Sequence, residues 1–188
     1  GLFYFMNISA KKVDQKVEET EGRARVLYGW QIKFVAFIAF SWSLFQLWYA
    51  SPLPFIFGFG VFIDVPARAL HLGFGLFLAF LTFPFLKKNR LKKIGLGNFL
   101  LALIGLGCTF YIFQNYEGLV YRNGVLLKHE VNLFGNIFNF PTELVIGAIG
   151  ILLLLEATRR AIGIPLVIVA SIFLIYSFFG QSMPEIIS

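Results

Sequence analysis

Two adjacent arginines near the end of the chain interrupt an apolar stretch that would otherwise be too long for one membrane-spanning helix. Four leucines, Leu152–Leu155, run into Glu156, Arg159 and Arg160, and a second apolar run continues to Phe179. The hydrocarbon core of a bilayer is about 30 Å thick and takes roughly 20 helical residues. We therefore expect two helices here, joined by a tight basic turn at one face of a membrane.

The composition places the whole chain among helical membrane proteins. Of its 188 residues 58% are hydrophobic, and the mean hydropathy is +0.77, a value that soluble domains rarely approach. The net charge of +6 comes from lysines and arginines in the short segments between apolar runs, which is the usual pattern of charges that set membrane topology. We therefore expect no nucleic-acid binding. The one cysteine, Cys108, lies in an apolar run and is expected to pack as a small side chain.

The predicted fold class is an all-α integral membrane protein with about five transmembrane helices. Prolines and short charged segments separate the apolar runs, because prolines end helices and charges mark the membrane surface. The stretch Phe55–Val65 is expected to lie at the membrane interface, with a re-entrant segment as the alternative. Small residues in the third run, Gly95, Gly97, Ala102, Gly105 and Gly107, indicate a face where another helix can approach closely. The predicted spans are 30–49, 67–86, 94–113, 144–155 and 164–179.

The distribution of positive charge predicts the orientation of these spans. All sixteen lysines and arginines except Arg68, Arg122 and Lys128 lie in segments that five alternating spans place on one side. Positive residues concentrate in short loops on the cytoplasmic side. We therefore expect the N-terminus in the cytoplasm, and both Ser188 and the polar segment Gln114–Glu143 on the opposite, outer side, which is the periplasm if the chain is from the family described below.

Few residues of the sequence indicate a chemical site. Glu156 precedes Arg159 and Arg160 by three and four residues, so an ion pair at the helix end is feasible, and we favour this structural role over one in transport. His71, one turn inside the second span, is a candidate membrane-embedded polar residue, and we favour a hydrogen-bonded structural role for it over a proton relay. The sequence contains no nucleophile–base pair, no metal-ligand spacing and no phosphate-binding loop. We therefore expect no enzyme, no metal site and no bound cofactor.

Three stretches of the sequence carry a resemblance to a known family. They are Arg68–Leu72 (RALHL), Asn115–Gly124 (NYEGLVYRNG) and, the most specific, Leu153–Gly163 (LLLEATRRAIG). Together and in this order they resemble the amino-terminal part of a fused permease of the TRAP (tripartite ATP-independent periplasmic) transporters, in the branch with TAXI-type binding proteins. The resemblance extends from about Arg68 to the end of the chain, whereas Gly1–Lys33 resembles no family that we can place.

The resemblance implies a domain organisation. Residues 1–29 would form a cytoplasmic tail or surface helix, 30–160 a four-helix domain like the small (Q-like) subunit of these transporters, and 161–188 a connecting helix towards a large (M-like) transport domain. In this family the small subunit is a scaffold for the large one, which holds the substrate and cation sites of an elevator-type transporter. No ion or substrate ligand is therefore carried over to this chain.

The resemblance also implies a function and partners. A periplasmic TAXI-type binding protein delivers a solute, typically an organic acid, and a Na⁺ or H⁺ gradient drives its uptake across the bacterial inner membrane. The expected partners are the large permease subunit or domain, that binding protein, for which Gln114–Glu143 is a candidate contact, and membrane lipids. The alternative is a free-standing helical membrane protein that binds lipid or a partner. An intramembrane enzyme that uses His71 or Glu156 is a third, disfavoured reading.

Overall fold

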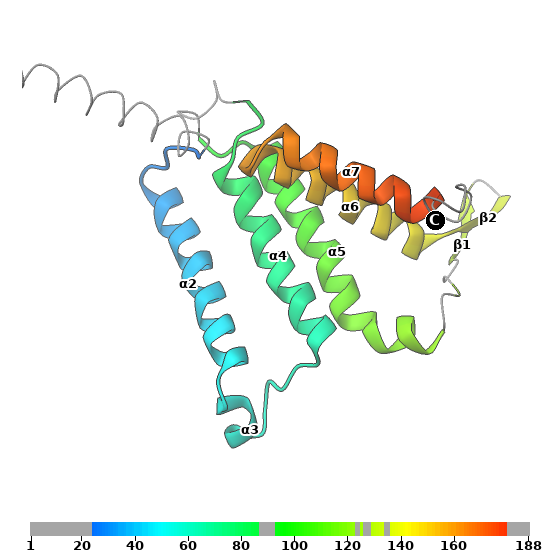
Figure 1. Cartoon of the computed structure of the whole chain (residues 1–188), viewed down its shortest axis with the longest axis horizontal. Coiled ribbons are helices and arrows are strands. Elements are labelled where there is room, and N and C mark those ends of the chain that lie inside the picture. The colour runs from blue at the N-terminus through cyan, green and yellow to red at the C-terminus, as the bar shows by residue number, and fades with distance from the viewer. Residues whose placement is uncertain (1–23, 87–92, 123–124, 126–128, 134–135, 180–188) are drawn as a thin grey trace, which may run out of the picture.

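The chain forms a helical bundle in a computed structural model that describes residues 24–86, 93–122, 125, 129–133 and 136–179 (Figure 1). Two short strands, β1 (His129–Leu133) and β2 (Asn136–Phe140), pair as an antiparallel hairpin in which His129 lies opposite Phe140. The other regular elements of the described residues are helices. Its helices are α2 (Trp30–Ala50), α3 (Leu53–Phe57), α4 (Asp64–Thr82), α5 (Leu96–Tyr121), α6 (Thr142–Ala161) and α7 (Ile164–Phe179).

Three of these helices are long and apolar enough to cross a membrane, namely α2, α4 and α5. They coincide with the first three predicted spans, which confirms the expectation of a helical membrane protein. The other two expected spans correspond to α6 and α7. Helix α6 has 20 residues but carries charges in its first and last turns, and α7 is apolar but has 16 residues. A total of five spans therefore stays a prediction.

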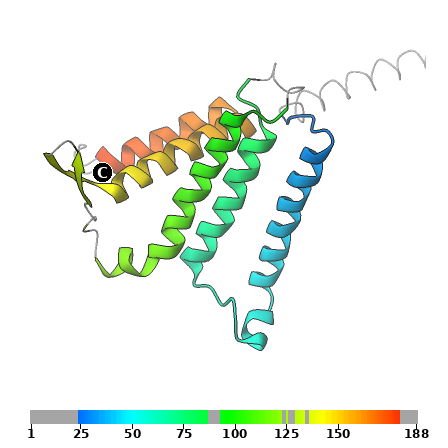
Figure 2. The same ribbon diagram turned by 180° about the vertical axis from the view of Figure 1, so that it is seen from behind.

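The helices form two groups. Helices α2, α4 and α5 stand side by side with roughly parallel axes, whereas α6 and α7 lie next to each other and cross this group at an angle (Figures 1 and 2). One end of the bundle, which we call the basic end, gathers the start of α2, the end of α4, the start of α5 and the α6–α7 turn. It is defined by Arg25, Lys93, Arg159 and Arg160, whose hydrogen bonds join these elements.

The core lies where α4 packs against α5 and α6. Phe80 and Leu81 of α4 are completely buried, and they pack with Ala102 of α5 and with Leu153 and Ala157 of α6. The small residues of α5 divide into two groups. Ala102 and Gly105 are buried in this contact, but a side chain added at Gly95, Gly97 or Gly107 would meet open space. The predicted helix-contact face is therefore narrower than the sequence indicated.

Helix α5 is longer than the predicted third span, which ended at Phe113. The helix continues to Tyr121, because the stretch from Gln114 to Tyr121 contains no proline. The side-chain amide of Asn115 donates to the carbonyl oxygen of Tyr111 at 3.0 Å, within the same helix. The first eight residues of the expected polar segment thus extend α5.

The hairpin is a local structure that the sequence analysis did not predict. Its strands alternate asparagine with valine, leucine, isoleucine and phenylalanine, and branched and aromatic residues favour the extended backbone. Sequence analysis had included these residues in the polar segment Gln114–Glu143. The interfacial position of Phe55–Val65 stays a prediction. This stretch comprises the end of α3, the irregular segment 58–63 and the first two residues of α4.

The turn between α6 and α7 is tight and depends on one glycine. The backbone N–H groups of Ile162 and Gly163 both donate to the carbonyl oxygen of Thr158, at 2.9 and 3.1 Å. Gly163 has a φ of 123°, which residues with a side chain rarely adopt. The chain therefore reverses at Gly163, and α7 returns alongside α6 (Figure 2).

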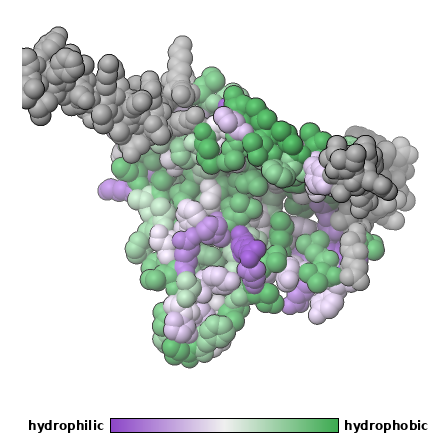
Figure 3. Space-filling view, in the orientation of Figure 1, coloured by the Kyte–Doolittle hydropathy of each residue, from purple (hydrophilic) through white to green (hydrophobic). Residues whose placement is uncertain are grey.

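The exterior of the helices is strongly apolar. Large hydrophobic side chains are exposed along α2 and α7, including Phe37 at 65% and Phe173 at 68% of their full accessible area. Figure 3 shows this hydrophobic surface over much of the visible face. Contiguous exposed apolar surface of this extent is typical of helices that contact lipid or another membrane helix.

The close contact between α4 and α5 can be tested at Gly73. A Cβ atom added there would lie 2.7 Å from the hydroxyl oxygen of Thr109 and 3.2 Å from a methyl carbon of Leu106, whereas one added at Gly75 would meet nothing within 4 Å. Both glycine-to-alanine changes raise helix propensity by about 1 kcal/mol. Overpacking typically costs about 1–3 kcal/mol. We expect Gly73→Ala to unfold at a lower temperature than Gly75→Ala in the same detergent, and equal melting temperatures would contradict the contact.

Candidate functional site

The most elaborate polar structure in the described residues is a cluster at the basic end, where α6 meets the end of α4 and the start of α5. We call it the arginine cluster and define it by Arg25, Asn98, Glu156, Arg159 and Arg160. Its members come from three parts of the chain that are far apart in sequence. It contains all three residues of the predicted ion pair.

Glu156 is the only carboxylate of this cluster and accepts from both neighbouring arginines. The Arg159 guanidinium donates to its two oxygens, at 2.7 Å to Oε2 and 2.8 Å to Oε1. The Nε of Arg160 donates to Oε1 at 2.7 Å. The spacings of three and four residues place all three side chains on one face of α6. The carboxylate is therefore held by two charge-assisted contacts, which are stronger than neutral hydrogen bonds.

Arg160 is the member that joins the helices. Its side chain is only 3% exposed, and it also donates to Oδ1 of Asn98 on α5 at 3.0 Å. Its guanidinium carbon lies 4.9 Å from the ring centre of Phe80 on α4, a favourable distance for a cation over an aromatic face. A buried guanidinium stays charged and needs partners on all sides. Arg160 therefore holds α4, α5 and α6 together.

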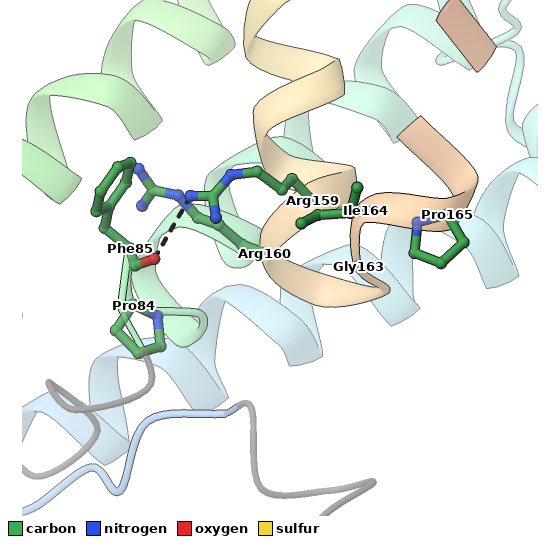
Figure 4. Close-up of a pocket in the computed structure, with 7 residues that line it drawn as sticks. All are labelled: Pro84, Phe85, Arg159, Arg160, Gly163, Ile164 and Pro165. Atoms are coloured by element: carbon green, nitrogen blue, oxygen red, sulfur yellow. Dashed lines mark hydrogen bonds between the residues drawn. The ribbon is translucent and has the colours of Figure 1, made fainter. Parts of the chain in front are cut away.

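Arg159 contacts the segment that follows α4. Its guanidinium carbon lies 4.7 Å from the ring centre of Phe85, and its NH2 group donates to the carbonyl oxygen of that residue at 3.4 Å. Figure 4 shows both arginine side chains directed towards Phe85, with Gly163 of the turn and Pro165 at the start of α7 on the side away from that ring. The side chain of Arg159 is 32% exposed, so it lies nearer the surface than that of Arg160.

Arg25 fixes the segment before α2 to the same place. Its backbone N–H donates to the carbonyl oxygen of Thr82 at 2.7 Å, and its guanidinium donates to the carbonyl oxygen of Lys93. Burial lowers the pKa of this guanidinium from its usual value, and the positive charge of Arg160 lowers it further. Two cations thus lie close enough to repel each other, so the basic end has a concentrated positive potential.

Two cavities adjoin the arginine cluster, and a third shares Gly95 with one of them. The one drawn in Figure 4 has a volume of about 310 Å³ and lies between Phe85, the two arginines and the start of α7. A second, of about 600 Å³, lies against Arg25, Lys93, Asn98 and Arg160. A third, of about 480 Å³, is apolar and is lined by Trp30, Phe34, Leu81, Ile94, Gly95, Leu96 and Phe99.

A second ion pair lies at the opposite end of α6, and the sequence analysis did not identify it. The Arg122 guanidinium donates to Oε1 of Glu143, and the phenol of Tyr111 lies 3.4 Å from the same oxygen. The carboxylate side chain is only 3% exposed. Sequence analysis had placed Arg122 and Glu143 in one long polar segment. Their pairing joins the end of α5 to the start of α6.

His71 contacts two residues of α2. Its Nδ1 lies 2.8 Å from the amide nitrogen of Gln46, and the indole N–H of Trp42 donates to it at 3.3 Å. The rings of Trp42 and His71 also meet edge to face, with centres 5.0 Å apart. These contacts support the favoured structural role, since they connect α2 to α4. Cys108 is buried.

The described residues contain no group of three or more histidine, cysteine, aspartate or glutamate side chains that could hold a metal ion. Comparisons of the chain with protein-family models, with curated proteins and with solved structures find no match. The cluster geometry is therefore the main basis for interpreting this chain, beside the motifs of its sequence.

The role of Glu156 can be measured against a matched surface pair. Glu156→Gln removes the charge that faces buried Arg160, and breaking a buried pair costs about 3 kcal/mol or more, so we expect about 2–3 kcal/mol for this partly exposed carboxylate. The control is Asp64→Asn, because Asp64 pairs with Arg68 at 2.8 Å with both side chains largely exposed. Such pairs contribute about 0–1 kcal/mol.

Denaturant unfolding of the two variants in mild detergent gives both free energies of unfolding. Equal decreases in the free energy of unfolding for the two variants would show that Glu156 does not compensate a buried charge. A larger loss for Asp64→Asn would contradict the assignment of the arginine cluster as the stabilising contact of the basic end.

Proposed function

We propose that this chain is the small, scaffold part of a secondary active transporter of the TRAP type, which holds a larger permease subunit or domain in the bacterial inner membrane. The observation that carries the proposal is the position of the three motifs that resemble this family. The second and third motifs include the ends of α5 and α6, and the first lies in the first half of α4. Each contains a side chain that joins its helix to another part of the bundle. A scaffold requires helices in fixed relative positions.

The most specific motif, Leu153–Gly163, supports this proposal most directly. It supplies the carboxylate and both arginines of the arginine cluster, together with the glycine that reverses the chain. The motif around Arg122 supplies the ion pair to Glu143. The first motif supplies His71, which contacts α2. Residues that resemble the family thus serve packing between helices in this chain.

The proposal includes five spans with the N-terminus in the cytoplasm. It is supported by the gathering of Arg25, Lys33, Lys93 and the two arginines of α6 near one end of the bundle. Arg68 and Arg122 lie at the other end, beside the start of α4 and the end of α5. Positive charge concentrates on the cytoplasmic side of inner-membrane proteins.

Helix α7 is the proposed contact with the large subunit. None of its residues, all within the described part of the chain, is buried. Its partly covered residues, Val167, Ala170, Ser171 and Leu174, recur at helical spacing and form one face, and α7 lies beside α6 (Figure 1). The remaining faces expose large apolar side chains. A connecting helix would present such a face to a partner helix in lipid.

The solute, by this proposal, is an organic acid that a periplasmic TAXI-type protein delivers, and uptake follows a Na⁺ or H⁺ gradient. The end of α5 and the β1–β2 hairpin form the candidate contact for that protein. Replacing 129–140 by a short glycine–serine linker keeps Arg122 and Glu143 in place. Unchanged uptake and unchanged docking of the binding protein would exclude this contact.

The proposal is tested by a photo-crosslinking experiment in native membranes. A benzophenone probe is attached at Phe173→Cys on α7, or at the control position Phe37→Cys on α2, in a Cys108→Ala background that removes the natural thiol. Both positions are exposed and lie near the middle of their helices. We expect the α7 probe to crosslink to a much larger multi-span protein, or to a transport part of the same polypeptide, in higher yield than the α2 probe.

Mass spectrometry of the intact species, released in gentle detergent, identifies the product. A lone species with no large partner at any detergent strength would contradict the scaffold proposal. It would favour the alternative function, a free-standing membrane protein that binds lipid or a partner. Crosslinking from α2 alone would keep the scaffold but move its contact surface.

A further inference from the structure

We propose that the basic end carries a binding site for one anionic phospholipid. In this site the headgroup phosphate occupies the cavity beside Arg25, Lys93 and Arg160, and an acyl chain occupies the neighbouring apolar cavity. The inference is independent of the transporter proposal, because it rests on the two cavities and on the charges around them.

The charge balance of the first cavity favours an anion. Three cationic side chains line it, Arg25, Lys93 and Arg160, and the described lining residues include no carboxylate. Glu156, the only carboxylate of the arginine cluster, does not line this cavity and is already shared between two arginines. A cavity with several fixed cations and walls of low polarity concentrates positive potential. An anion bound there would gain charge-assisted hydrogen bonds.

The second cavity makes a phospholipid a better occupant than a free anion. Its lining is apolar and mostly aromatic or aliphatic, and it meets the basic cavity at Gly95, which lines both. A free phosphate would use only the basic cavity. A phospholipid uses both, because its acyl chain gains from the removal of apolar surface from water.

The location also fits a lipid. Trp30 lines the apolar cavity at the start of α2, and tryptophan is enriched at the boundary between headgroups and hydrocarbon. The surrounding helices expose apolar side chains. A headgroup at the level of Lys93 would therefore leave its chains alongside the helices. Basic cavities between transmembrane helices are known to bind anionic headgroups.

The test uses the full chain, purified in an uncharged detergent, with native mass spectrometry to count bound lipids. Dioleoyl phosphatidylglycerol, which is anionic, is compared with dioleoyl phosphatidylcholine, which has the same chains and no net charge. We expect the anionic lipid to bind at least about tenfold more tightly, since each cation near a headgroup contributes about fivefold. Equal affinity for the two lipids would overturn the proposal.

Two variants locate the site. Lys93 is exposed and its backbone oxygen, not its side chain, accepts from Arg25, so Lys93→Gln should keep the fold. We expect it to weaken phosphatidylglycerol binding by about fivefold and to leave phosphatidylcholine unchanged. The matched control is Arg68→Gln, an exposed cation at the opposite end. An equal loss for both variants would show non-specific attraction and overturn the proposal.

Two further measurements separate the lipid from other occupants. Gly95→Leu adds a side chain where the two cavities meet, at a backbone φ of −78° that leucine adopts freely and with open space around its first carbon. We expect it to reduce the affinity for the anionic lipid by about tenfold. That factor corresponds to the loss of about two methylene groups' worth of buried apolar surface. Inorganic phosphate is added as a competitor. Displacement of the lipid by phosphate at equal concentration, or full binding by Gly95→Leu, would overturn the assignment of a phospholipid.

Discussion

The structure depends on one constraint above all, namely that a buried guanidinium keeps its charge and must be surrounded by partners. Arg160 meets this requirement with a carboxylate from its own helix, an amide oxygen from α5 and an aromatic ring from α4. Because these partners come from three different helices, the positions of α4, α5 and α6 are coupled to this side chain. An aliphatic residue in the same place would not fix the relative positions of these helices in this way, since dispersion contacts are not directional.

The packing of the bundle follows from the absence of a hydrophobic driving force between helices in lipid. Helices then associate through close contact and through a few polar bonds. Here α4 and α5 approach at Gly73 and Gly105, and polar contacts connect the remaining helices, His71 to α2 and Glu143 to α5. Polar contacts therefore add to the apolar core between α4, α5 and α6, and many other large apolar side chains face outwards.

The parts of the fold that depend on neighbouring residues could be predicted from the sequence. The start of α2 at Trp30 and the chain reversal after Arg160 follow from local runs of apolar residues, charge and glycine. The pairing of Glu156 with both arginines follows from helical spacing alone. Contacts between distant residues could not be predicted. Asn98 meets Arg160, and Arg25 meets Lys93, only because the helices cross at angles that side-chain packing determines.

The two contacts that attach the ends of α6 to α5 and the residue after it, an ion pair and a hydrogen bond, have a mechanical consequence. Glu143 ties the first turn of α6 to Arg122 after α5, and Arg160 in its last turn is tied to Asn98 on α5. Sliding α6 along α5 by one helical turn, about 5.4 Å, would separate both attachments at once. The position of α6 along α5 is therefore fixed at both ends of the helix. Any large displacement within an assembly would take place along the outer surfaces of α2 and α7, where the exposed side chains are large and apolar and dispersion contacts are not directional.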